Sequence, residues 1–107
     1  MQINGRDVNF LYTVGAYCEY SDWLVSLGTK GASAARGIIR LAVAMNKAYN
    51  EVNDVQGDPM TVRELESLPA YVFEELKEEV EKAEQEGKKR SVEEEETAGK
   101  NAAAAKK

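Results

Sequence analysis

Residues 32–52 read ASAARGIIRLAVAMNKAYNEV, and this stretch decides the fold class. Its large apolar residues recur every three or four positions, which predicts a helix with one apolar stripe. The predicted stripe consists of Ile38, Leu41, Met45, Ala48 and Val52. The small residues at the start of the stretch allow a neighbouring backbone to approach closely. We therefore expect this helix to pack against other helices in a mainly helical domain.

The preceding segment has the same periodicity. Its predicted stripe consists of Val14, Tyr17, Tyr20, Leu24 and Leu27. Thr13 is a suitable N-cap, and Gly28 is a typical residue just beyond a helix end. A loop over residues 28–31 then leads into the helix described above. Because this loop is short, we expect the two helices to pack antiparallel.

Two further helices are expected after a loop at residues 53–59. Thr61 and Glu64 have the spacing of a capping box, in which each side chain binds a free backbone amide of the other residue. A short helix through Leu68 follows, and Pro69 suits the first turn of a new one. We expect this last helix to end at Gly87. Its predicted buried residues are Val72, Phe73, Leu76, Val80 and Ala83.

The N-terminal ten residues have a different pattern. Asn4-Gly5 lies between two short alternating segments, and these residue types tolerate the positive φ angles of a type I′ turn. The sequence therefore predicts a short β-hairpin. Because an isolated hairpin is marginally stable in water, we expect Ile3, Val8 and Phe10 to lie against the helices.

The C-terminal twenty residues contain one large apolar residue, Val92. Such a segment cannot offset its ordering entropy by burial. We therefore predict a helical binding domain over residues 1–87 and a disordered, charged tail over residues 88–107.

Charge and composition restrict the function. The net charge is −5, and residues 58–107 contain fourteen acids and nine bases. We do not expect the protein to bind nucleic acid, because that requires a cluster of basic residues on one surface. No apolar run approaches the roughly 18 residues of a membrane span, and no signal peptide is apparent. We expect a cytoplasmic protein with no membrane partner.

The residue types needed for catalysis are largely missing. The chain has no His, and Cys18 is its single cysteine, so neither a metal cluster nor an activated thiol is expected. The carboxylates lie in solvated stretches rather than in a pattern typical of acid-base catalysis. The sequence predicts no catalytic residues, no cofactor and no metal, and a binding protein rather than an enzyme.

Aromatic residues and methionine suggest the binding surface. Tyr and Trp are enriched among interface anchors, and Met adapts to varied apolar partners. We predict that Tyr20, Trp23, Met45 and Tyr49 contact a partner, the alternative being that they belong to the core. Domains of this size often gain stability by association, so a homo-oligomer is a further possibility.

Two segments of the chain form a recognisable combination. The first comprises Ile3-Asn4-Gly5-Arg6 through Phe10, followed by Thr13-Val14-Gly15-Ala16, and the second is MTVRELESLPAYVFEEL at residues 60–76. Together they resemble the tail assembly chaperones of long-tailed bacteriophages and prophages. The resemblance covers roughly residues 2–86. It implies a small protein that covers the apolar tape-measure protein during tail assembly and helps to recruit tail-tube subunits.

A second interpretation remains open. The Glu-rich last helix and tail are also typical of an acidic inhibitor or DNA mimic that binds a basic protein surface. The salt dependence of binding distinguishes the two functions, because binding that is driven by charge weakens as ionic strength rises.

Overall fold

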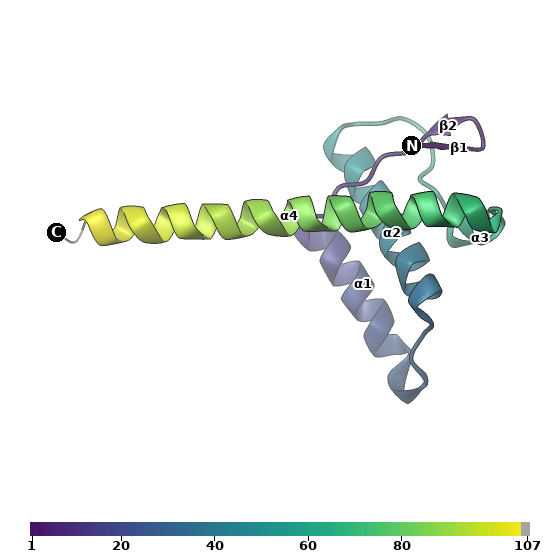
Figure 1. Ribbon diagram of the computed structural model, residues 1–107, viewed down its shortest axis with the longest axis horizontal. Helices are drawn as coiled ribbons and strands as arrows, with labels where there is room; N and C mark the ends of the chain where they lie inside the picture. The colour runs from purple at the N-terminus through teal and green to yellow at the C-terminus, as the bar shows by residue number, and fades with distance from the viewer. Residues whose placement is uncertain (106–107) are drawn as a thin grey trace.

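The computed structural model describes the backbone of residues 1–105 and the side chains of residues 1–89. The predicted fold class, mainly α with a short N-terminal β-hairpin, is confirmed. Figure 1 shows α1 and α2 as an antiparallel helical hairpin that the long helix α4 crosses. The elements are β1 (Gln2–Ile3), β2 (Arg6–Asp7), α1 (Val14–Ser26), a 3-10 turn (Gly28–Lys30), α2 (Ala34–Val52), α3 (Val62–Glu66) and α4 (Ala70–Ala105).

The hairpin has the predicted turn. Asn4 and Gly5 have φ angles of 50° and 79°, as a type I′ turn requires. Ile3 pairs with Arg6 in the antiparallel ladder. Ile3 and Val8 are buried, so the hairpin covers part of the helical core.

The helix ends also follow the sequence. The hydroxyl of Thr13 accepts a hydrogen bond from the Ala16 amide at 3.1 Å, which starts α1. Gly28, with a φ of 60°, follows the end of α1. Thr61 and Glu64 form the predicted capping box of α3.

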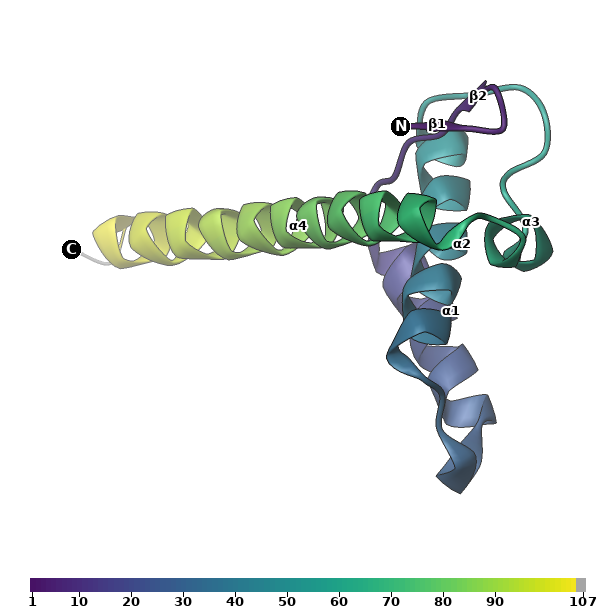
Figure 2. The ribbon, with the colours of Figure 1, turned by 45° about the vertical axis from the view of Figure 1, so that its right-hand side comes forward.

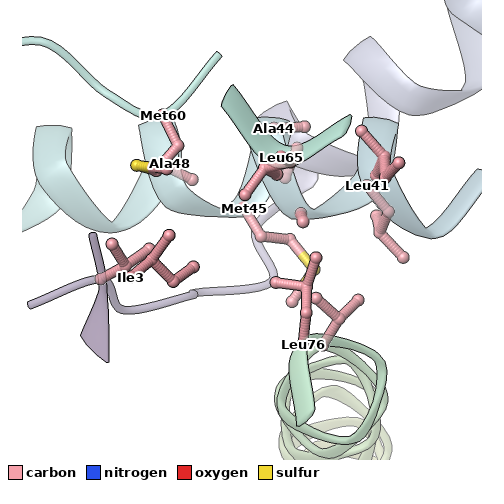
Figure 3. Packing of buried hydrophobic residues seen from close by; sticks show 13 residues of the cluster. Ile3, Leu41, Ala44, Met45, Ala48, Met60, Leu65 and Leu76 are labelled. Atoms are coloured by element: carbon pink, nitrogen blue, oxygen red, sulfur yellow. The ribbon is translucent and has the colours of Figure 1, made fainter. Parts of the chain in front are cut away.

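The core is built around α2. Figure 3 shows Met45 of α2 pointing toward Leu76 of α4, with Leu65 and Met60 on other sides of the same helix. Burial of side chains of this size stabilises a fold by about 1.5–3 kcal/mol each. The buried residues of α2 are Ile39, Leu41, Ala42, Ala44, Met45, Asn46 and Ala48.

One buried polar side chain joins three segments of the chain. Asn46, which is 3% exposed, donates a hydrogen bond from Nδ2 to the Asn9 carbonyl at 2.9 Å. Its Oδ1 accepts a bond from the Met60 amide at 2.8 Å. Because these bonds satisfy backbone groups near the core, Asn46 fixes the N-terminal arm, which we define as residues 8–13, and the segment before α3 against α2.

The predicted stripes of α2 and α4 need correction. Val52 is 66% exposed, because it is the last residue of α2 and the chain turns into a loop directly after it. In α4, Leu76 and Val80 are buried as predicted, whereas Val72, Phe73 and Ala83 are only half-buried. The contact of α4 with the core is therefore narrower than its apolar pattern indicates.

Gly87 does not end the last helix, contrary to the prediction. α4 continues through it to Ala105, as Figure 2 also shows. A Cβ atom at Gly87 would lie 2.8 Å from Tyr12 Cβ and 3.0 Å from the Tyr12 carbonyl oxygen. The glycine therefore allows the N-terminal arm to cross α4 closely, although glycine costs a helix about 1 kcal/mol relative to alanine.

The predicted boundary at residues 87 and 88 thus lies inside a helix. Most of the predicted tail, residues 90–107, lies outside the residues whose side chains are described. Its predicted disorder stays a prediction.

Candidate functional site

α1 has two apolar sides, and only one of them faces the rest of the protein. Its inward side consists of the buried Ala16 and the half-buried Tyr20, Trp23 and Leu27. These residues recur at intervals of four, three and four, so they share one side of the helix. α1 packs against α2 through this side.

The second side of α1 is exposed. We define the α1 outer face as Val14, Tyr17, Cys18, Ser21, Leu24 and Val25, which also recur every three or four residues. Val14 and Val25 are 80% and 79% exposed, and Tyr17 and Leu24 are 55% and 42% exposed. Cys18 is exposed as well. The Tyr12 ring lies edge-on against Tyr17, with 6.5 Å between the ring centres, and Ser21 is half-buried. The helix therefore presents an apolar stripe about three turns long that is largely exposed.

Specific contacts fix the orientation of α1. The Tyr20 and Trp23 rings lie 6.0 Å apart, and the Arg40 guanidinium lies 5.4 Å from the centre of the Trp23 ring. A Cβ atom at Gly37 would lie 3.2 Å from the Tyr20 hydroxyl, so this glycine helps Tyr20 to reach α2. These contacts hold the aromatic side inward and leave the outer face in solvent.

The predicted partner residues are not brought together as one surface. Tyr20 and Trp23 are half-buried in the α1–α2 contact. Met45 is fully buried, so its prediction as a surface contact is wrong: it points toward Leu76 instead of solvent (Figure 3).

Tyr49 lies in a different place. It lines a pocket of about 190 Å³ between the N-terminal arm and α4. The pocket combines apolar groups with two glutamates and one lysine. Its lining residues are Met1, Val8, Asn9, Phe10, Tyr49, Glu79, Lys82, Ala83 and Glu86.

The outer face was missed although its signal is present in the sequence. Val14, Tyr17 and Leu24 were assigned to the same stripe as Tyr20 and Leu27. Val25 and Cys18 complete a second stripe, and the two together exceed what one packed side can bury. The pattern shows that two apolar sides exist, but only packing shows which one is covered.

Charges beside the outer face are mostly acidic. The Glu19 carboxylate accepts a hydrogen bond from the Lys47 ammonium at 2.7 Å, and this bond raises the pKa of Lys47. Asp22 is exposed and has no ion-pair partner among residues 1–89. α1 therefore offers one uncompensated carboxylate next to its apolar stripe.

A strongly acidic stretch lies on α4. Residues 74–86 contain seven glutamates and two lysines. All of these side chains except the half-buried Glu84 are exposed. This part of α4 consequently presents negative charge to solvent.

The described part of the chain contains neither a cluster of metal ligands nor a helix that could span a membrane. Within it, no three His, Cys, Asp or Glu side chains gather closely enough to hold a metal ion. None of the helices there combines the length and apolar content that a bilayer span requires.

Neither a family model, a curated protein nor a solved structure matches the chain.

Proposed function

We propose that the chain is a tail assembly chaperone of a long-tailed bacteriophage or prophage, acting in the cytoplasm of the bacterial host. In this proposal it binds the tape-measure protein through the α1 outer face and helps to recruit tail-tube subunits. The proposal combines the sequence resemblance with one structural observation: the exposed apolar stripe over Val14, Tyr17, Leu24 and Val25.

The energetics favour a binding role for this stripe. A large apolar side chain stabilises a complex or fold by about 1.5–3 kcal/mol when it is fully buried. These side chains are not buried in the core around α2, so the binding of a partner can bury them and gain this free energy. A contiguous exposed apolar patch is typical of an interaction site.

The chemistry of the partner fits such a surface. A tape-measure chain, as the resemblance implies, exposes apolar helical segments until the tail tube encloses it. A small protein that covers these segments keeps them soluble, and it must release them when tube subunits arrive. An apolar contact of modest area suits reversible binding.

Co-expression with the tape-measure protein of the same tail gene cluster tests the proposal. We expect the tape-measure protein to become more soluble and to copurify with the chain. The double variant Val14→Gln/Val25→Gln should lose this effect, whereas Val52→Gln, which alters an exposed valine at the end of α2, should keep it. Copurification that does not depend on the α1 outer face would contradict the proposal.

One observation favours a second function, that of an acidic inhibitor or DNA mimic. The exposed glutamates at residues 74–86 of α4 suit a basic protein surface. Their binding would weaken steeply between about 50 and 500 mM salt, because the interaction of exposed charges is screened over about 10 Å at 0.1 M. Capture through the α1 outer face should change little over the same range. A steep loss of tape-measure capture with salt would favour the acidic function.

A further inference from the structure

We infer that the α1 outer face binds a single amphipathic helix with basic residues beside its apolar seam, as a third helix alongside the α1–α2 hairpin. This inference rests on the proposed function, because it specifies the chemistry of the partner at the same site. The first argument is shape: the face is a straight stripe on one helix, with large apolar side chains at both ends and the small Cys18 and Ser21 between them. Small residues at the middle allow another helix to approach closely.

The charge of α1 argues against a second copy of the chain as occupant, because pairing two α1 outer faces would bring together two helices that carry Glu19 and Asp22 and no basic residue. The stripe from Val14 to Val25 is about 17 Å long, at 1.5 Å per residue, and a helix is about 10 Å wide. A helix docked along the stripe buries an area on the order of 200 Å² per partner, less than the about 800 Å² per partner of a standard stable interface, so we expect the contact to be weak and reversible.

Charge complementarity specifies the flank of the partner helix. Asp22 lies beside the stripe and has no ion-pair partner among residues 1–89, while the nearby Glu19 is already paired with Lys47. α1 carries no basic residue of its own. A lysine or arginine beside the partner's seam would pair with Asp22, whereas a glutamate there would be repelled.

Two peptides test the inference with the intact chain. Each is a fluorescent helical peptide of about fourteen residues, or about 21 Å. A covalent bridge on the side away from α1 keeps it helical, and leucines at intervals of three and four residues form the side that faces α1. One has lysines beside the leucines and the other has glutamates. Fluorescence anisotropy measures the affinity of each peptide. At low salt we expect the lysine peptide to bind at least about threefold more tightly than the glutamate peptide, and not much more, since exposed ion pairs contribute modestly.

Three variants locate the contact. Val14→Gln/Val25→Gln should weaken binding of the lysine peptide at least about tenfold, which corresponds to the loss of two apolar anchors. Val52→Gln should have no effect, and Asp22→Lys should reverse the preference between the peptides. The fold of each variant is checked by its thermal unfolding midpoint.

The outcomes separate this inference from the proposed function. Binding of neither peptide, equal affinity for both, or dimerisation of the chain that the double variant abolishes would overturn the inference. If the tape-measure protein still copurifies through the α1 outer face in that case, the proposed function stands. If the lysine peptide binds as expected but the tape-measure protein does not, the helix inference stands and the phage function fails.

Discussion

α1 and α2 form the two halves of one helical hairpin, yet they use their apolar residues in opposite ways. α2 buries seven residues against elements on several of its sides. α1 buries only Ala16 fully and leaves four large apolar side chains in solvent. The contrast shows that α2 serves the stability of the domain, whereas the outer side of α1 contributes little to it and is available for binding.

The largest effect that this comparison predicts is in the core. Met45→Ala removes most of a fully buried side chain that contacts α4 (Figure 3) and should destabilise the fold by about 2–5 kcal/mol. Urea unfolding followed by circular dichroism measures this change. A loss below about 1 kcal/mol would mean that α2 is not the centre of the core.

A smaller effect is expected at the buried polar junction. Asn46→Ala removes the side-chain partner of the Met60 amide and the Asn9 carbonyl. We expect a loss of about 1–3 kcal/mol, because the Met60 amide is buried and becomes unsatisfied, whereas the half-buried Asn9 carbonyl can bind water. The exposed Asn53 provides a control, because its side chain also binds a backbone carbonyl, that of Tyr49. Asn53→Ala should cost less than about 1 kcal/mol. Equal losses in the two variants would contradict the role of Asn46 as a junction.

Gly87 and Gly15 both lie within helices but differ in how closely other atoms approach them. Gly87→Ala gains helix propensity, but its Cβ meets the Tyr12 backbone, so we expect a net loss of about 1–2 kcal/mol. At Gly15 the nearest contact of a Cβ is 3.7 Å, to the Thr13 hydroxyl. Gly15→Ala should therefore stabilise the protein, by about 0.5 kcal/mol. Thermal unfolding of both variants compares the two sites, and a stabilising Gly87→Ala would show that the arm does not cross α4 there.

The smallest effect is expected on the α1 outer face. Val14→Gln/Val25→Gln should change the free energy of unfolding by no more than about 0.5 kcal/mol, because both side chains are already exposed. Urea unfolding checks this value. A loss of 2 kcal/mol or more, which is typical of core truncation, would show that the face is covered within the folded protein.

Local features of the fold were predictable, and tertiary ones were not. The Asn4-Gly5 turn, the Thr13 cap and the Thr61–Glu64 capping box depend on neighbouring residues, so the sequence specifies them. The end of the last helix was mispredicted at Gly87, because the need for glycine there comes from Tyr12, which is distant in sequence.

The candidate site was less predictable for the same reason. Residue type alone favoured Met45 and Tyr49 as contacts, although Met45 is central to the core. Periodicity identified the apolar residues of α1 but could not tell its inward side from its outward side, because that choice depends on where α2 lies. Aromatic content pointed to α1, which carries the exposed apolar stripe, but Tyr20 and Trp23 are half-buried on its inward side.

Chemical labelling of Cys18 tests the central claim most directly. Cys18 is the only cysteine, lies within the α1 outer face and is exposed, so its reaction with a maleimide reports whether the face is covered. We expect the free protein to react at the rate of an accessible thiol, and the complex with the tape-measure protein to react at least about tenfold more slowly. Slow labelling of the free protein, or labelling that the partner leaves unchanged, would contradict the account of α1 as an uncovered docking surface.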